Sequence, residues 1–437
     1  MIRLDAWFCS SRRHAFAAGL LLVAAAFVAG CGDDTCSTKC GTGGAGTGGA
    51  NAGGAGTGGG LECPATGFYH GPWVQKFDET SAFVRWDACA EGDVSITVEP
   101  DGGGAQTKFT GAQTAADVTT DYHGVAGVMP DWPGTYYLSE VHVTGLDPAT
   151  CYRYTVDSEP DRGGRFCTAR LSGDTFSFMT IGDTNPAIAP TEEMVALELM
   201  KSPDFIIHLG DIQYYTSVLD SWSQWFVSMG PMLEGGAFQP CVGNHESENP
   251  TEYADYYDRL FADAGFDGTR EYFRYETGGV WFFSLDSELD LLRGPQVDWL
   301  TAQLADAKTQ PGFRGSIVYL HRPVISVADG GNHPDWRAHW EPIFLENGVV
   351  LVMSGHMHGY ERYFTENSLT YIVSGGGGGL VGDIDANVAT FPEDAALRVA
   401  KAASFHLMHF EVTTTSLEGA ALDPTGAELD AFSVPLP

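Results

Sequence analysis

The chain has 437 residues, and its 57 Asp and Glu residues outnumber its 23 Lys and Arg residues, for a formal net charge of -34. Such a surface repels other polyanions, so we expect neither nucleic acid nor an anionic membrane surface as a binding partner. Hydrophobic residues make up 43% of the chain and aromatic residues 12%, which is enough for two packed domains.

The N-terminus predicts an export signal over residues 1–30. Arginines precede an apolar run at 15–29, which is too short to span a membrane. The run leads to Cys31 in a sequence that resembles the lipobox of bacterial lipoproteins, where this cysteine is lipidated and becomes the new N-terminus. The alternative is an ordinary secretory signal with an incidental cysteine. The lipobox predicts an exported protein, periplasmic or at the cell surface, that a lipid on Cys31 anchors to a membrane.

Residues 31–61 are predicted to be a flexible tether, because the stretch from 41 to 60 is almost entirely Gly, Thr and Ala. The tether separates the membrane anchor from the folded part of the protein.

Nine cysteines are present, and removal of Cys9 with the signal and lipidation of Cys31 leave seven. An odd number means that one is unpaired or bonded to another chain. Cys151 and Cys167 flank a hairpin-like segment and are the preferred disulfide pair. Cys241 begins a strand that reads as buried, and we expect it to be the free cysteine.

Residues 62–172 contain short runs of alternating apolar and polar residues, for example at 81–86, 94–98 and 137–143. Gly, Pro and Asp separate these runs. The pattern predicts a small antiparallel sandwich without a catalytic constellation. The segment at 145–152 resembles the turn before a late strand of fibronectin type III domains.

From Thr175 onward the pattern changes to apolar strands that alternate with amphipathic helices, which predicts an α/β domain over residues 173–437. Strands are expected at 176–181, 205–209 and 238–242, helices at 191–200, 221–232 and 251–264, and a hairpin at 272–285. A further helix at 296–307 places four apolar side chains on one face, those of Val297, Leu300, Leu304 and Ala307.

Five polar clusters fall at or just beyond the ends of predicted strands, where open α/β sheets place their ligand sites. Glycine precedes both aspartates and allows close approach of the backbone to a metal. One aspartate can bridge two cations, and two histidines spaced i, i+2 can each face one metal. The clusters therefore predict a two-metal hydrolytic site, with candidate ligands Asp183, Asp211, Tyr214, Asn244, His321, His356 and His358.

These clusters resemble the Gly-Asp-x-Gly, Gly-Asp-x-x-Tyr, Gly-Asn-His-Asp/Glu, Val-x-x-His and Gly-His-x-His motifs of purple acid phosphatases, which are calcineurin-like metallophosphoesterases. The resemblance covers about residues 62–437 and favours the larger, plant-type branch. It implies a fibronectin type III-like β-sandwich followed by an α/β metallophosphoesterase domain, with a two-sheet β core flanked by helices.

The resemblance also implies the metals and their ligands. A ferric ion would be bound by Asp183, Tyr214 and His358, with Asp211 bridging. A divalent ion, zinc, manganese or iron, would be bound by Asn244, His321 and His356. The phenolate of Tyr214 is a hard anionic donor that favours Fe(III); the alternative is a packing tyrosine.

Two further histidines are candidate catalytic residues. His245 follows a predicted ligand and is our candidate general acid for the leaving alcohol, although it could instead order its loop. His333 could contact the substrate. Asn185 replaces a glycine of the motif, which the left-handed tolerance of asparagine would permit. Gly375–Gly379 lacks the residues of a nucleotide-binding loop and reads as a flexible turn beside the site.

The expected function is an exported acid phosphatase that hydrolyses phosphate monoesters with water activated by two metals. A metallophosphodiesterase of the same fold is one alternative. A surface-binding lipoprotein with a vestigial site is another. The sequence leaves the physiological substrate and the oligomeric state open.

Overall fold

The computed structural model describes residues 63–122, 129–185, 191–214, 221–261, 271–329 and 331–437. All of them belong to one compact unit, residues 58–437. The predicted export signal, Cys31 and the tether lie outside the described residues and stay predictions. Within the described part of the chain, no helix has the length and apolar character needed to cross a membrane.

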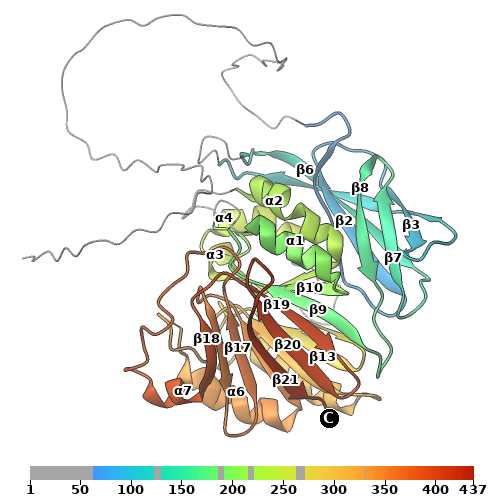
Figure 1. Ribbon diagram of the computed structural model, residues 1–437. Helices are drawn as coiled ribbons and strands as arrows, with labels where there is room; N and C mark the ends of the chain where they lie inside the picture. Colours follow the sequence, from blue (N-terminus) through green and yellow to red (C-terminus); the bar gives the residue numbers. More distant parts are fainter. Residues whose placement is uncertain (1–62, 123–128, 186–190, 215–220, 262–270, 330) are drawn as a thin grey trace, which may run out of the picture. The chain divides into compact units, whose positions relative to one another are not determined.

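The largest sheet has ten strands in the order β21-β20-β19-β9-β10-β11-β1-β2-β6-β5 (Figure 1). Its central strands β9, β10 and β11 are parallel, so their carboxyl ends lie at one edge. The bounds are β1 (Phe68–Gln75), β2 (Ser81–Ala88), β5 (Ala112–Val118), β6 (Gly134–Thr144), β9 (Phe176–Ile181), β10 (Phe205–His208), β11 (Ala237–Pro240), β19 (Leu407–Val412), β20 (Ser416–Leu422) and β21 (Glu428–Pro435).

A second sheet has seven strands in the order β12-β13-β14-β15-β17-β16-β18. Strands β13, β14, β15 and β17 are parallel, and the predicted hairpin at 272–285 is confirmed as β12 and β13. The bounds are β12 (Phe273–Thr277), β13 (Val280–Ser284), β14 (Gly315–Leu320), β15 (Val349–Ser354), β16 (Tyr360–Phe364), β17 (Thr370–Ser374) and β18 (Arg398–Ala402).

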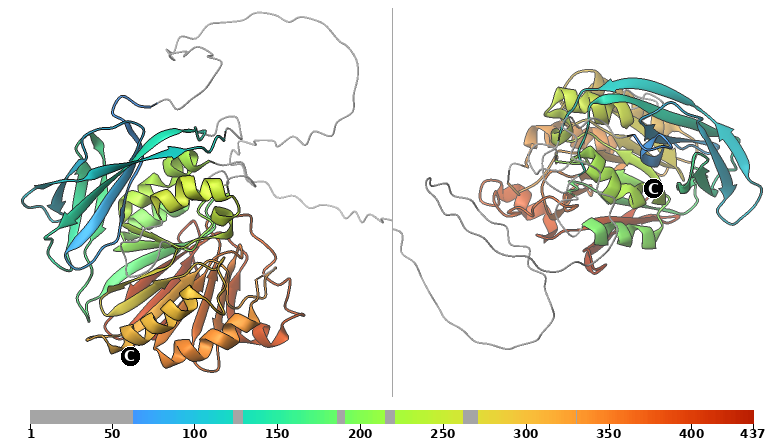
Figure 2. Two further views of the ribbon diagram at one scale, coloured as in Figure 1. Left: turned by 180° about the vertical axis from the view of Figure 1, so that it is seen from behind. Right: turned by 90° about the horizontal axis from the view of Figure 1, so that it is seen from above.

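Helices cover the outer faces of these two sheets, as Figure 2 shows for the second sheet. The predicted helix at 296–307 is confirmed, with its four apolar side chains buried. The predicted helix at 251–264 is instead a short α-helical turn followed by a π-helical segment, Tyr253–Asp258. The α-helices are α1 (Thr191–Lys201), α2 (Trp222–Gly235), α3 (Asn244–Ser247), α4 (Pro250–Glu252), α5 (Pro295–Thr309), α6 (Pro334–Glu346) and α7 (Pro392–Leu397).

The N-terminal strands are not a free-standing sandwich. A four-stranded sheet packs against β1, β2 and β6 through a common apolar core, and those strands continue into the ten-stranded sheet where Val74 of β1 pairs with Ala237 of β11. The fibronectin type III likeness and the boundary after residue 172 stay predictions. The four strands are β3 (Ser95–Pro100), β4 (Thr107–Thr110), β7 (Cys151–Val156) and β8 (Glu159–Cys167).

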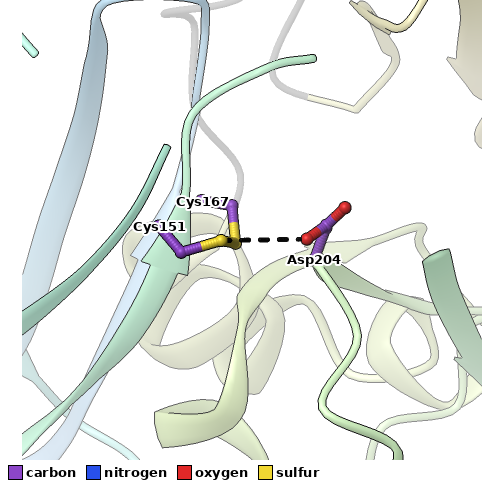
Figure 3. A group of neighbouring side chains, drawn as sticks. All are labelled: Cys151, Cys167 and Asp204. Atoms are coloured by element: carbon purple, nitrogen blue, oxygen red, sulfur yellow. Dashed lines mark hydrogen bonds between the residues drawn. A yellow bond between two sulfur atoms is a disulfide. The ribbon is translucent and has the colours of Figure 1, made fainter. Parts of the chain in front are cut away.

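The predicted disulfide between Cys151 and Cys167 is confirmed, and these residues pair directly across β7 and β8. Asp204 lies beside it, with Oδ1 4.0 Å from Cys151 Sγ (Figure 3). Both sulfurs are used in the disulfide, so this group is not a metal site. A second disulfide joins Cys63 to Cys89, and Cys241 is free and buried as expected.

Aromatic side chains hold the two large sheets together. Phe178 of β9 stacks on Phe205 and Phe410, with ring centroids 5.3 and 4.6 Å apart. Phe282 of β13 in the second sheet meets both Phe178 and Phe205 edge-on, at 5.3 Å in each case. This fully buried cluster fixes one sheet against the other, so that loops from both can form one site.

Candidate metal centre

Asp183 and Asp211 lie in the loops that follow β9 and β10. Both are buried, and both have left-handed backbone conformations, with φ of 59° and 50°. Such angles are uncommon for residues other than glycine, and they persist only where the surrounding structure holds them. The Asp183 N–H donates to Gly210 O at 3.0 Å, and the Thr184 N–H donates to Asp211 O at 3.1 Å. These hydrogen bonds join the two loops.

His356 follows β15 and has a third left-handed backbone, with φ of 68°. Its N–H donates to Asp183 Oδ2 at 2.9 Å. Gly355 is required before it, because a Cβ there would lie 2.6 Å from the same oxygen. The second sheet therefore supplies its ligand loop directly against the first aspartate.

One group of predicted ligands consists of Asp183, Tyr214 and His358. Tyr214 Oη lies 3.2 Å from Asp183 Oδ1 and 2.7 Å from His358 Nε2. His358 Nε2 is 3.4 Å from the same carboxylate oxygen. His358 Nδ1–H donates to Leu380 O at 2.8 Å, which leaves Nε2 facing its neighbours.

The other group consists of Asp211, Asn244, His321 and His356. His321 Nε2 is 3.2 Å from Asp211 Oδ1, 3.1 Å from Asn244 Oδ1 and 3.1 Å from His356 Nδ1. His321 Nδ1–H donates to Leu209 O at 2.8 Å, so Nε2 is the nitrogen that faces this group. The ligand atoms of Asp211, His321 and His356 lie within 4.8 Å of one another, as a metal site requires.

Burial and the two aspartates shift the pKa values of several side chains in the site. Burial, with Asp183 and Asp211, raises the pKa of the Tyr214 phenol well above its usual range. Burial alone would raise the pKa of Asp211, but His321 holds it below its ordinary value. Burial opposes protonation of His321 as well, yet Asp211 outweighs it and raises the pKa of that imidazole to about 10. Positive charge beside Asp211 is thus strongly favoured.

The donor set fits two cations. All seven predicted ligands converge, and they offer carboxylate, phenol and amide oxygens together with imidazole nitrogens. Carboxylate and phenolate oxygens suit a hard ion such as Fe(III), and imidazole suits zinc or iron. Metal identity and the assignment of each ligand to one ion stay predictions.

Glu246 supports the site, although it was not among the predicted site residues. Its carboxylate accepts from the N–H groups of Asp211, Ile212 and Gly243 at 2.9, 2.8 and 2.8 Å. Glu246 occupies the third position of α3, where an acidic side chain turns back to the start of the helix. This position in the sequence could have predicted its role. The carboxylate thereby ties the loop of one ligand to the helix that carries another, Asn244.

His245, the candidate general acid, contacts Asp211 and Tyr214. Its N–H donates to Asp211 Oδ1 at 2.9 Å, and its Nε2 is 3.9 Å from Asp211 Oδ2. The ring lies against Tyr214, with centroids 4.5 Å apart. Nδ1 is 3.2 Å from Glu248 Oε1, a close ion-pair distance without the direction of a hydrogen bond. The side chain is 19% exposed, so it can reach both the site and solvent.

His333 lies farther out, just before α6. Its ring stacks on Trp336, with centroids 3.8 Å apart. Burial lowers the pKa of His333, and the charge of Arg322 lowers it further. Arg322 in turn contacts His356, whereas no contact joins His333 to a predicted ligand among the described residues.

The glycine run at 375–379 is docked against the site and is not a free turn. Gly377 N–H donates to Gly182 O at 2.9 Å, and Gly379 N–H donates to Asp183 O at 2.8 Å. A Cβ on Gly379 would lie 2.4 Å from the His358 ring. Asn185 also differs from expectation, because the left-handed residue of its loop is Asp183.

Comparison with known proteins agrees with this geometry. Residues 176–360 match the calcineurin-like phosphoesterase family. An uncharacterised Mycobacterium tuberculosis protein is 29% identical over 52% of this chain and 50% of its own length. Purple acid phosphatase 22 of Arabidopsis thaliana is 28% identical over 44% of this chain and 49% of its own length. The chain thus spans about half the length of these curated relatives.

Among solved structures, a purple acid phosphatase from yellow lupin (Lupinus luteus) seeds has the same fold, with a TM-score of 0.66. It is 17% identical, over 83% of this chain and 73% of that one. The protein therefore contains a calcineurin-like metallophosphoesterase domain. Within that class, it is similar to purple acid phosphatases in sequence and in fold.

The contact between Gly379 and His358 generates a prediction. Gly379→Ala must displace the His358 imidazole, because the new Cβ would lie 2.4 to 2.7 Å from three of its ring atoms. We expect metal affinity to fall by about 10- to 100-fold, as when a group that orients a ligand is changed. Titration of the metal-free protein with metal measures this.

Gly382→Ala is the matched control, because the nearest atom to its added Cβ is 4.0 Å away. Equal metal affinity in the two variants would contradict the assigned role of the glycine loop.

Proposed function

We propose that this protein is a binuclear-metal acid phosphatase that hydrolyses phosphate monoesters. The observation that carries the proposal is the convergence of seven candidate ligands from the loops of both sheets, with Tyr214 among them. In the proposed arrangement, a ferric ion is held by Asp183, Tyr214 and His358, and a divalent ion by Asn244, His321 and His356. Asp211 would contact both.

The place of Tyr214, whose Oη lies 3.2 Å from Asp183 Oδ1 and 2.7 Å from His358 Nε2, supports the choice of metal. A buried phenol beside two carboxylates keeps its proton unless a strongly Lewis-acidic cation replaces it. Fe(III) is such a cation, and zinc or manganese is weaker. A phenolate ligand at this position would therefore favour iron over zinc or manganese.

Two bound cations would supply an activated water and would neutralise charge on the phosphate. The residues of the chain position the ligands and supply a proton. Asp183 and Asp211 keep the ligand loops joined, while His321 and His358 are oriented by hydrogen bonds to backbone carbonyls. His245 donates a proton to the oxygen of the leaving alcohol.

The protein is further proposed to act outside the cytoplasm as a lipoprotein. Two disulfides support an oxidising compartment. A Cys31→Ser variant should move from the membrane fraction to the soluble fraction, because its lipid attachment site is gone. Immunoblotting of the two fractions measures this. Retention of the variant in the membrane would show that the anchor is elsewhere.

The metal proposal predicts a visible absorption band from a Tyr214–iron bond in the full chain purified without chelator. We expect Tyr214→Phe to lose the band, and Asp211→Ala to lose both metals and turnover. Spectra and iron content on the same samples test this. A colourless protein with divalent ions alone would favour the phosphodiesterase alternative, and a metal-free protein would favour the vestigial site.

The proton-donor assignment predicts a different result for His245→Ala. Metal content should stay the same, while turnover falls by about 10²- to 10⁴-fold. The loss should be greatest for alkyl phosphates, whose leaving groups need a proton, and small for 4-nitrophenyl phosphate. Steady-state rates on both substrates provide the measurement, and an equal loss on both would contradict the role.

A further inference from the structure

Arg322 lies at the edge of the candidate metal centre and was not among the predicted site residues. Its Nη1 donates to His356 Nε2 at 3.0 Å. Its Nε and Nη2 donate to the two carboxylate oxygens of Glu288 at 2.5 and 3.2 Å. The Arg322 side chain is 29% exposed, so a solute can reach the guanidinium. The residue therefore connects a predicted ligand with the solvent-facing side of the site.

The contact between Arg322 and His356 conflicts with metal ligation by that histidine. His356 Nδ1 faces His321 Nε2 at 3.1 Å, so Nδ1 is the nitrogen directed into the ligand group. A neutral imidazole that binds a metal through Nδ1 carries its proton on Nε2. A guanidinium has donors only. Two donors would then face each other at 3.0 Å, and Arg322 Nη1 must leave when His356 becomes a ligand.

Glu288 determines where the freed guanidinium can go. The Glu288 carboxylate accepts hydrogen bonds from Nε and Nη2 of Arg322. The guanidinium therefore stays at the site when Nη1 loses its contact with His356, and Nη1 is then free to donate to another acceptor. The charge of Arg322 is felt at His333, whose buried Nε2 has no hydrogen-bond partner among the described residues. The ring of His333 is held by stacking on Trp336. The partly exposed guanidinium is thus available to an oxyanion.

We propose that Arg322 is an anion-binding arm that donates to a phosphate oxygen of the substrate when His356 ligates a metal. The inference rests on the proposed function and names a specificity-determining residue for it. Arg suits the role because its planar fork can donate to the carboxylate of Glu288 and to a phosphate together. On a protein with a net charge of -34, a fixed cation here also counters the general repulsion of phosphate.

The test uses the metal-loaded full chain with inorganic phosphate as the probe. We expect Arg322→Gln to weaken phosphate binding about tenfold or more, since a charge-assisted hydrogen bond is lost. Arg322→Lys should recover part of that affinity, because lysine keeps the positive charge but lacks the planar set of N–H donors. Calorimetric titration gives the phosphate affinity. With a monoester substrate, KM should rise more than kcat falls.

A second readout separates this role from simple damage to the site. Because Arg322 competes with metal for the orientation of His356, Arg322→Gln should bind the divalent ion several-fold more tightly. A damaged site would bind it more weakly. Arg293→Gln is the matched control, since that side chain is 86% exposed and paired with Asp290, and it should change neither affinity.

Unchanged phosphate affinity in Arg322→Gln, with metals bound and the wild type active, would overturn this inference alone. Weaker divalent-metal binding in that variant would overturn the proposed competition for His356. Failure of the wild-type chain to bind metal would overturn the proposed function, and this inference with it.

Discussion

The site depends on keeping two buried carboxylates, Asp183 and Asp211, beside each other. An ionised carboxylate that is buried without partners is strongly unfavourable, so each must be met by hydrogen-bond donors or by positive charge. Backbone N–H groups of His356 and His245 donate to one aspartate each. His321 adds an imidazole whose pKa is raised by Asp211. Bound cations would add further positive charge beside the two carboxylates.

This constraint extends into the backbone and the fold. The left-handed conformations of Asp183, Asp211 and His356 are strained choices that persist because the surrounding hydrogen bonds hold them. The ligands come from loops of both sheets, so their convergence requires the aromatic packing between Phe178 and Phe282. Stability of the core and geometry of the site are therefore coupled through the packing of the two sheets.

The charge of the protein shows why local and overall electrostatics must be considered separately. A strongly acidic surface repels phosphate at long range, and salt screens that repulsion beyond about 10 Å. Inside the site, the predicted cations and Arg322 would reverse the sign of the charge that an incoming phosphate meets. Glu288 neutralises part of the charge on Arg322 but holds the guanidinium in place. Substrate selection in this proposal is thus a property of the rim as well as of the metals.

Some features could be predicted from the sequence because they depend on neighbours along the chain. The face of the helix with Val297 and Leu300, the hairpin at 272–285 and the Cys151–Cys167 disulfide are of this kind. The positions of the seven candidate ligands were also predictable, since each follows a strand in a recognisable local pattern. Local order along the chain carries this information without any knowledge of the packing.

Other features were decided by tertiary contacts. Glu246 meets three N–H groups from two loops, and Arg322 meets Glu288 across 34 positions of sequence. The N-terminal strands join the main sheet through the pairing of Val74 with Ala237. No local periodicity encodes such contacts, because they depend on how distant segments are brought together. The sequence by itself determined which residues could bind metals and where strands would present them; the tertiary structure decided which side chains support and surround them.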